Sequence, residues 1–168
     1  MPKIMEIAIH RQQRKTLAFR LTSGGATVFI PRGLEPDSDT VQQFIAAALE
    51  RLPAPEPTPE PQTALQIHTL VAAWAQRIGV KPVRIQVRRM RNKWGSISTA
   101  GTLTLTDDIL RLPRDLAEYV VVHELLHLKF PDHRKGWQVS MGAYLPNWRE
   151  RERRLAAYIQ LAPSLSSI

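Results

Sequence analysis

The chain has 168 residues, 43% of them hydrophobic, enough for the core of one domain or of a domain with a small appendage. It has no cysteine, which excludes disulfide bonds, thiolate metal sites and cysteine nucleophiles. Lysine and arginine outnumber aspartate and glutamate by 23 to 15, a formal net charge of +8. We therefore expect a basic surface that attracts nucleic acid or another polyanion at low salt.

The sequence shows neither a signal peptide nor a membrane segment. Charged residues interrupt the first 16 positions before an apolar run of signal-peptide length can form. No stretch approaches the roughly 18 apolar residues that cross a bilayer. We expect a cytoplasmic protein with no membrane partner.

The N-terminal part has the pattern of a small β unit followed by a helix. Residues 4–9 and 17–30 are rich in strand-forming side chains, and Ser23-Gly24-Gly25 supplies a turn inside the second stretch. A helix is expected over residues 40–52, where apolar side chains recur on one face. We assign residues 1–52 to this N-terminal β unit and helix.

A proline-rich segment, PAPEPTPEP, follows at residues 53–61. Proline at every second position removes backbone donors and favours an extended polyproline conformation. We interpret residues 53–62 as a semi-rigid linker, so that residues 63–168 form a second, catalytic domain.

The second region begins with a helix and a small sheet. The helix is expected over residues 63–78, with Gly79 as its stop, and its apolar face includes Leu65. Residues 83–90 alternate between apolar and polar side chains, which predicts a strand with Val83 pointing inward. Residues 97–105 read as a hairpin that turns at Ala100-Gly101.

Helices dominate the rest of the chain. Pro113 suits the first position of a helix that runs to about Lys129, and Pro131 ends it. Residues 136–144 and 148–159 also have helical patterns. Strands and helices are segregated along the chain, which predicts the α+β class, with the helix of residues 113–129 beside a small antiparallel sheet.

The stretch VVVHELLHLKFPDHRKGW, residues 120–137, places histidines in a largely apolar helix. His123 and His127 are four positions apart and lie on one helix face, where both can bind one Zn²⁺ ion. Glu124 is placed to hold a water molecule at that metal and to take its proton. The pattern therefore predicts a zinc-dependent hydrolase with Glu124 as the general base.

A catalytic zinc site needs a third protein ligand and one open position. His133 follows His127 by six residues across Pro131, so the chain can fold back and bring His133 to the metal. Glu150 or Glu152 from the last helix is the alternative third ligand. A second alternative is that the histidines are structural, but buried imidazoles are costly unless they are paired or metal-bound.

Four motifs resemble the YgjP-like metallopeptidase domain, a zincin-like family related to the SprT-like metalloproteases. The quoted stretches are RKTLAFRLTSGGATVFIPRGL, RNKWGSIS, YVVVHELLHLKFPDHRKGW and LPNWRERERRL, in the order in which the family has them. The resemblance covers most of the chain but not the proline-rich segment. Ile97 stands where the family usually has cysteine.

The resemblance implies a zincin-like catalytic unit that acts on a peptide or protein substrate. It implies His123, His127 and His133 as zinc ligands and Glu124 as the catalytic base. In zincins an edge strand beside the zinc helix pairs with extended peptide, and Trp94, Gly95 and Ser96 are the candidates for that substrate-binding strand.

Two further interpretations stay open from the residues. Asp132 or Glu118 is a candidate to accept the second ring N–H of a ligand histidine. Basic residues next to the proposed site, among them Lys93, also fit a metal-dependent nucleotide or phosphate-ester hydrolase, although no glycine-rich phosphate loop accompanies them. A nucleic-acid-associated protease or binding module is the other alternative that the charge allows.

Overall fold

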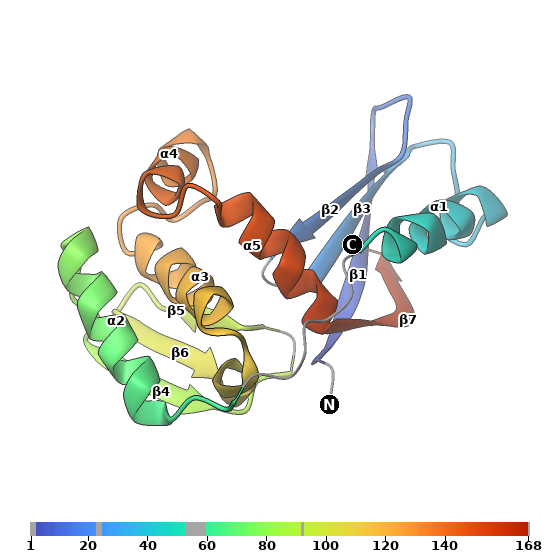
Figure 1. The fold of residues 1–168 in the computed structure, drawn as a ribbon. Coiled ribbons are helices and arrows are strands. Elements are labelled where there is room, and N and C mark those ends of the chain that lie inside the picture. The colour runs from blue at the N-terminus through green and yellow to red at the C-terminus, as the bar shows by residue number, and fades with distance from the viewer. Residues whose placement is uncertain (1–2, 23–24, 53–59, 92, 168) are drawn as a thin grey trace. The chain divides into compact units, whose positions relative to one another are not determined.

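The computed structural model describes residues 3–22, 25–52, 60–91 and 93–167 (Figure 1). The chain forms two compact units, one made of Met1–Pro55 with Arg153–Ile168 and the other of Glu56–Glu152. Most of the predicted linker and part of the predicted turn at residues 23–25 lie outside the described residues. The predicted domain boundaries stay predictions.

The first unit is a four-stranded sheet with one helix. Its strands are β1 (Lys3–Gln12), β2 (Ala18–Thr22), β3 (Gly25–Pro31) and β7 (Ile159–Ser167), in the order β2-β3-β1-β7. β1 runs parallel to β3 and β7, while β2 and β3 are antiparallel neighbours. Helix α1 (Asp39–Glu50) contributes Val41 and Ile45 to a core shared with β1 and β3.

The second unit combines helices with a three-stranded sheet (Figure 1). Helix α2 (Ala64–Ile78) starts in a capping box between Thr63 and Gln66 and stops at Gly79, whose φ of 75° is in the left-handed region that favours glycine. The sheet contains β4 (Arg84–Arg88), β5 (Gly95–Ile97) and β6 (Thr102–Thr106), in the order β4-β6-β5.

The α+β class is confirmed, but the small sheet is mixed and not antiparallel as predicted. β5 and β6 form the predicted antiparallel hairpin, whereas β4 and β6 are parallel. The reason lies in the strand order, because β5, the next strand after β4 in the chain, lies on the far side of β6. β6 then enters between two strands of opposite direction and must run parallel to one of them.

Two side chains expected in the core lie on the surface. Leu65 is 76% exposed at the start of α2, and Val83 is 80% exposed. Val83 precedes β4, and its backbone N–H donates to the carbonyl of Gly101, so it belongs to the end of the ladder rather than to its buried part. Apolar periodicity alone does not show where a strand begins, so it could not show that Val83 lies before the start of β4.

Two of the three helices after the sheet, α3 and α5, are shorter than predicted, while α4 has almost the predicted bounds. A 3₁₀ turn, η1 (Asp107–Arg111), leads to α3 (Arg114–Leu126), which ends three residues before Lys129. Helices α4 (Lys135–Tyr144) and α5 (Trp148–Leu155) follow, then a 3₁₀ turn, η2 (Ala156–Tyr158). The predicted helix of residues 148–159 thus gives way to strand β7 at Ile159.

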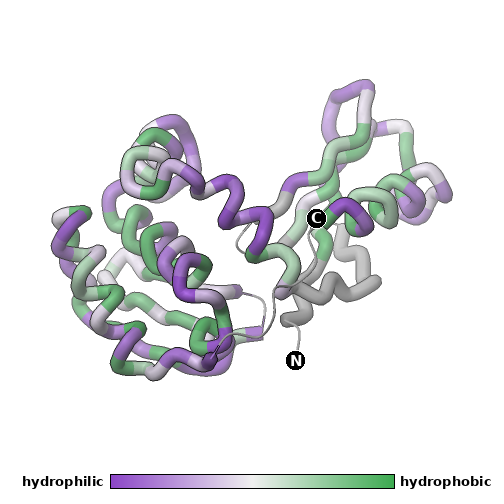
Figure 2. Tube along the Cα trace, in the orientation of Figure 1, coloured by the Kyte–Doolittle hydropathy of each residue, from purple (hydrophilic) through white to green (hydrophobic). Residues whose placement is uncertain are grey.

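Helix α3 is the central element of the second unit. Ten of its residues are buried, from Leu116 to Leu126 with the exception of Glu118, and it contacts both α2 and β5. Figure 2 shows the contrast between the hydrophobic middle of α3 and the almost wholly hydrophilic α5. Among the described residues, no helix is long and apolar enough to cross a membrane.

Candidate metal centre

Three histidines meet at the end of helix α3. His123 lies in its last turn, His127 is its C-cap residue, and His133 precedes α4. One ring nitrogen of each lies within 4.8 Å of the others, and the Nε2 atoms of His123 and His133 are 2.9 Å apart. Within the described part of the chain, no other histidine, cysteine or acidic residues form such a group of three.

The segment between the helices brings His133 back to α3. The backbone N–H groups of Lys129 and Phe130 both donate to the carbonyl of Leu126, which closes the last turn before Pro131. The Lys129 ammonium donates to the Ile78 carbonyl at the end of α2 (2.6 Å). On the other side of the turn, the Gln138 side chain donates to the His133 carbonyl (2.9 Å). The predicted return of the chain after Pro131 is confirmed.

The Nδ1 atoms of His123 and His127 each have a hydrogen-bond partner. His127 Nδ1 lies 2.9 Å from the Phe130 carbonyl oxygen, which only accepts, so Nδ1 carries the proton and Nε2 has a free lone pair. His123 Nδ1 lies 3.4 Å from the Tyr119 hydroxyl, which donates to Glu152 Oε1 (3.0 Å). Neither Asp132 nor Glu118 takes these positions, so that prediction is wrong for His123 and His127.

The cluster favours uncharged imidazoles. Burial lowers the pKa of His123 well below its usual value, and the neighbouring His133 and His127 lower it further. Burial and His127 also lower the pKa of His133, against an opposing effect of Asp132. A divalent cation needs ring nitrogens that converge and can give up their protons, so the grouping of these three residues fits a metal ion.

Trp137 of α4 packs among the three histidines. Its ring centroid lies 4.8 Å from that of His123, 6.1 Å from that of His127 and 4.7 Å from that of His133. The indole is 2% exposed and meets Trp148 edge to face, with centroids 5.5 Å apart. This aromatic wall keeps the imidazole rings in place and excludes water from one side of the cluster.

Glu124 lies next to His123 on α3 and is 6% exposed. Burial raises the pKa of its carboxyl group from 4.5 to about 7, although Lys93 acts in the opposite direction. Among the described residues, no side chain forms a hydrogen bond or an ion pair with this carboxylate. A buried, unpaired carboxyl group with a pKa near neutrality can both take up and release a proton at pH 7.

Strand β5 contacts α3 and forms the outer edge of the sheet. A Cβ atom at Gly95 would lie 2.8 Å from Cγ of Glu124 and 3.1 Å from Cδ2 of Leu105, so only glycine leaves room for the Glu124 side chain. Trp94 is 2% exposed, and Ser96 is half-buried. These are the three residues predicted to bind substrate.

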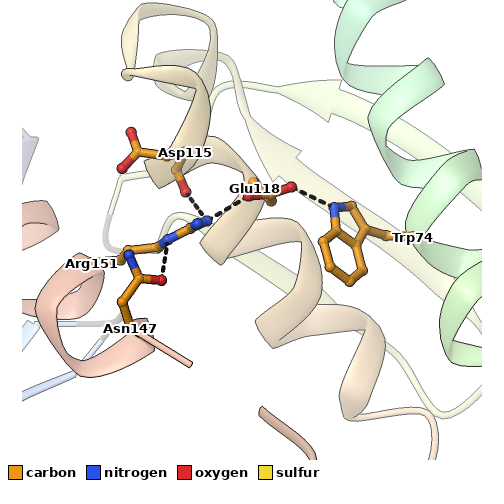
Figure 3. Close-up of polar contacts among 5 residues, drawn as sticks. All are labelled: Trp74, Asp115, Glu118, Asn147 and Arg151. Carbon is orange, nitrogen blue, oxygen red and sulfur yellow. Dashed lines mark hydrogen bonds and ion pairs between the residues drawn. The ribbon is translucent and has the colours of Figure 1, made fainter. Parts of the chain in front are cut away.

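A second polar cluster lies near the start of α3 (Figure 3). Glu118 accepts from the indole N–H of Trp74 (3.0 Å) and from the Arg151 guanidinium (2.5 Å). Arg151 also donates to the Asp115 carbonyl and to the Asn147 side chain, each at 3.0 Å. These bonds tie α2, α3 and α5 together, which gives Glu118 a structural role in place of the predicted one.

The sequence interpretation missed Tyr119 and did not anticipate the contact that Glu152 makes. Tyr119 is fully buried, four residues before His123, and burial and Glu152 raise its pKa well above 10. Its position one helical turn from a candidate ligand was the available signal. Glu150 and Glu152 were the alternative third ligands. Glu152 accepts a hydrogen bond from the Tyr119 hydroxyl, and Glu150 is exposed.

Comparison with solved structures gives two similar proteins. Two crystal structures of metallopeptidase zymogens are similar to the chain. Abylysin from Pyrococcus abyssi has 25% sequence identity and a TM-score of 0.47, and the match covers 53% of this chain and 87% of that one. Jannalysin from Methanocaldococcus jannaschii has 22% identity and a TM-score of 0.47, with 51% and 89% covered. No curated protein matches the chain significantly.

The family comparison covers the whole metal centre. The model of the YgjP-like metallopeptidase domain matches residues 60–158, more than half of the chain. This range contains α2, the mixed sheet, α3 with the histidines, and α5. The resemblance stated from the four motifs is confirmed: the chain belongs to the YgjP-like metallopeptidase family.

Proposed function

We propose that this metallopeptidase is zinc-dependent, with His123, His127 and His133 as the three protein ligands. The observation that carries the proposal is the convergence of three ring nitrogens within 4.8 Å of one another. These three histidines would hold the ion, and a set of three protein ligands is typical of catalytic zinc sites. Zinc bound there would polarise the scissile carbonyl as a Lewis acid and make a water molecule more acidic.

Glu124 is the general base in this proposal. Its carboxylate takes a proton from the attacking water and passes that proton to the nitrogen of the leaving amine. Its burial and its pKa of about 7 support this role, because the group then changes protonation state near the working pH. The absence of a fixed partner among the described residues leaves both oxygens available for the proton transfer.

An extended peptide is the proposed substrate, bound along the outer edge of β5. β5 pairs with β6 on one side only, and Gly95 places its backbone against the Glu124 side chain. A peptide that adds to this edge by backbone hydrogen bonds brings its carbonyl groups close to the catalytic carboxylate. Gly95 and Ser96 take part through their main chain, while the buried Trp94 supports the strand from within.

A polyanion is the second binding partner that the residues support. Between Gly79 and Thr106 the chain has six lysines and arginines and no acidic residue. Arg84, Arg88, Arg89, Arg91 and Lys93 are all exposed. Binding to nucleic acid through these residues would weaken steeply as salt is raised, which an electrophoretic shift assay at two salt concentrations measures.

Metal content is the first test of the proposed centre. Wild type, His133→Ala and Glu124→Gln are purified, exchanged into metal-free buffer and examined by elemental analysis. We expect about one zinc per chain in the wild type and in Glu124→Gln, and a clear loss in His133→Ala. Unchanged zinc in His133→Ala would assign the third ligand to another residue, and a metal-free wild type after zinc is supplied would contradict the proposal.

Peptide hydrolysis is the second test. Cleavage of an unstructured peptide library is compared between the zinc-loaded wild type and Glu124→Gln, with Glu150→Gln as the matched control because Glu150 is exposed on α5. We expect activity in the wild type and in the control only. Equal activity in Glu124→Gln would exclude Glu124 as the base.

A further inference from the structure

Behind the metal centre, a chain of hydrogen bonds links His123 to helix α5. The Tyr119 hydroxyl lies 3.4 Å from His123 Nδ1 and donates to Glu152 Oε1 at 3.0 Å. The rings of Tyr119 and His123 are arranged edge to face, with centroids 5.7 Å apart. Tyr119 and Glu152 both belong to the second unit, so the contact lies within one compact body.

The direction of the hydrogen bonds follows from what each group can donate. An ionised carboxylate only accepts, so the tyrosine must direct its single proton to Glu152. The oxygen of Tyr119 then offers only a lone pair to His123, and His123 Nδ1 must be the donor. One proton on Nδ1 leaves Nε2 with its lone pair directed at His133 and His127.

We propose that Tyr119 and Glu152 are positioning residues that fix the tautomer and orientation of His123 for metal binding. The inference rests on the proposed function, because it takes His123 as a ligand. It adds two residues to the centre, one of them from a helix that carries no metal ligand. Outer hydrogen bonds of this kind typically change metal affinity by about 10–100-fold.

Burial makes this arrangement effective. Tyr119 is fully buried and His123 is 4% exposed, so water does not compete for the hydroxyl or for Nδ1. In such surroundings an unpaired polar group is costly, and the hydrogen-bonded arrangement has few alternatives. Loss of the Glu152 acceptor would let the tyrosine proton turn towards Nδ1. That change would favour the tautomer with a proton on Nε2, which cannot bind metal.

Three variants separate these contributions. Tyr119→Phe removes the hydroxyl with little change of shape, Glu152→Leu removes the acceptor, and Glu152→Gln keeps an acceptor oxygen without the charge. Glu150→Gln on the same helix is the matched control. Zinc affinity is measured by competition with a chromophoric chelator, and thermal unfolding of each variant is recorded in parallel.

We expect a loss of zinc affinity of about 10–100-fold in Tyr119→Phe and in Glu152→Leu, with an intermediate loss in Glu152→Gln and none in the control. The double variant should lose no more than the larger of the two single losses, because both residues act through one path. Zinc affinities within twofold of wild type in both single variants, at unchanged stability, would overturn the inference.

The tautomer of His123 provides a readout that does not need metal. Nitrogen NMR shifts of the imidazole in the zinc-free protein distinguish a proton on Nδ1 from one on Nε2. We expect the Nδ1–H form in wild type and a mixture or the Nε2–H form in Glu152→Leu. An Nε2–H form in wild type would overturn the inference even where zinc binds. If His123 has the Nδ1–H form but the protein does not bind zinc, the result would contradict the proposed function and not this inference.

Discussion

Two carboxylates of helix α3, those of Glu118 and Glu124, are in opposite situations. Glu118 is held by an indole N–H and a guanidinium, and it links three helices. Glu124 is more deeply buried and has no such partner among the described residues, and its pKa is raised to about 7. Glu118, which has a cation beside it, and Glu124, which is buried among mostly apolar side chains, are only six positions apart.

The difference shows how one helix serves two purposes. A carboxylate with a cation and a donor beside it stabilises the packing through those hydrogen bonds. A carboxylate that is buried without such partners has a raised pKa, which costs stability. A pKa of about 7, as for Glu124, suits a group that exchanges protons near neutral pH. The four predictions below test this contrast, beginning with the largest effect.

Activity should separate the two carboxylates most clearly. If Glu124 is the base as proposed, Glu124→Gln removes proton transfer, so we expect peptide hydrolysis to fall by about 10²–10⁴-fold while zinc stays bound. Glu118→Gln should keep the rate of wild type at a temperature where it is folded. Initial rates at saturating substrate with parallel zinc analysis measure this, and a comparable loss in Glu118→Gln would erase the distinction.

Stability of the zinc-free protein should depend on pH through Glu124. Its pKa is raised from 4.5 in the unfolded chain to about 7, so between these values the folded state holds more protons, and the free energy of unfolding falls as pH rises. The full difference is about 3 kcal/mol above pH 7. The lowered pKa values of His123 and His133 add a contribution that rises with pH and is shared by both proteins. Between pH 5 and pH 8, denaturant unfolding should therefore show a larger rise in the free energy of unfolding in Glu124→Gln than in wild type. Parallel curves would argue against a buried, titrating Glu124.

Gly95→Ala should displace the proposed catalytic carboxylate of Glu124 without touching the proposed histidine ligands. The added Cβ would lie 2.8 Å from Cγ of Glu124, which must move aside. A misplaced base is expected to lower kcat by up to about 10²-fold, with zinc affinity unchanged. Gly33→Ala, where an added Cβ meets nothing within 4 Å, is the matched control for the added methyl group. Wild-type kcat in Gly95→Ala would mean that Glu124 has room to adapt.

Glu118→Gln should chiefly affect stability. It leaves the half-buried Arg151 guanidinium without its ion pair, at an expected cost of about 1–3 kcal/mol in the free energy of unfolding. Asp132→Asn breaks the exposed ion pair with Arg134 and should cost less than about 1 kcal/mol. Urea unfolding of the zinc-loaded proteins compares the two, and equal costs would show that burial adds nothing to the first pair.

The histidine cluster and its elements could be predicted because local rules determine them. The four-residue spacing of His123 and His127 and the break at Pro131 both act within a few residues. The parallel pairing of β4 with β6 could not be predicted in the same way, because it depends on the position that β5 takes in the sheet. Nor could strand β7, which pairs with β1 from the other end of the chain.

The candidate site shows the same division. His123, Glu124, His127 and His133 follow from a motif, whereas the partner of His123 Nδ1 depends on how α5 returns to α3. Both Glu118 and Glu152 are acidic residues near the histidines in sequence or in the expected fold. Only the packed helices decide that Glu118 meets Arg151 and that Glu152 meets Tyr119.

The turn between α3 and α4 is fastened at both ends. Lys129 is tied to the end of α2, and the His133 carbonyl is tied to Gln138. A segment held in this way has already lost much of its freedom before any cation arrives, so ligand capture costs little conformational entropy. The free energy released on coordination is then available as affinity, and the rate of metal capture should be set by desolvation of the ion rather than by ordering of the chain.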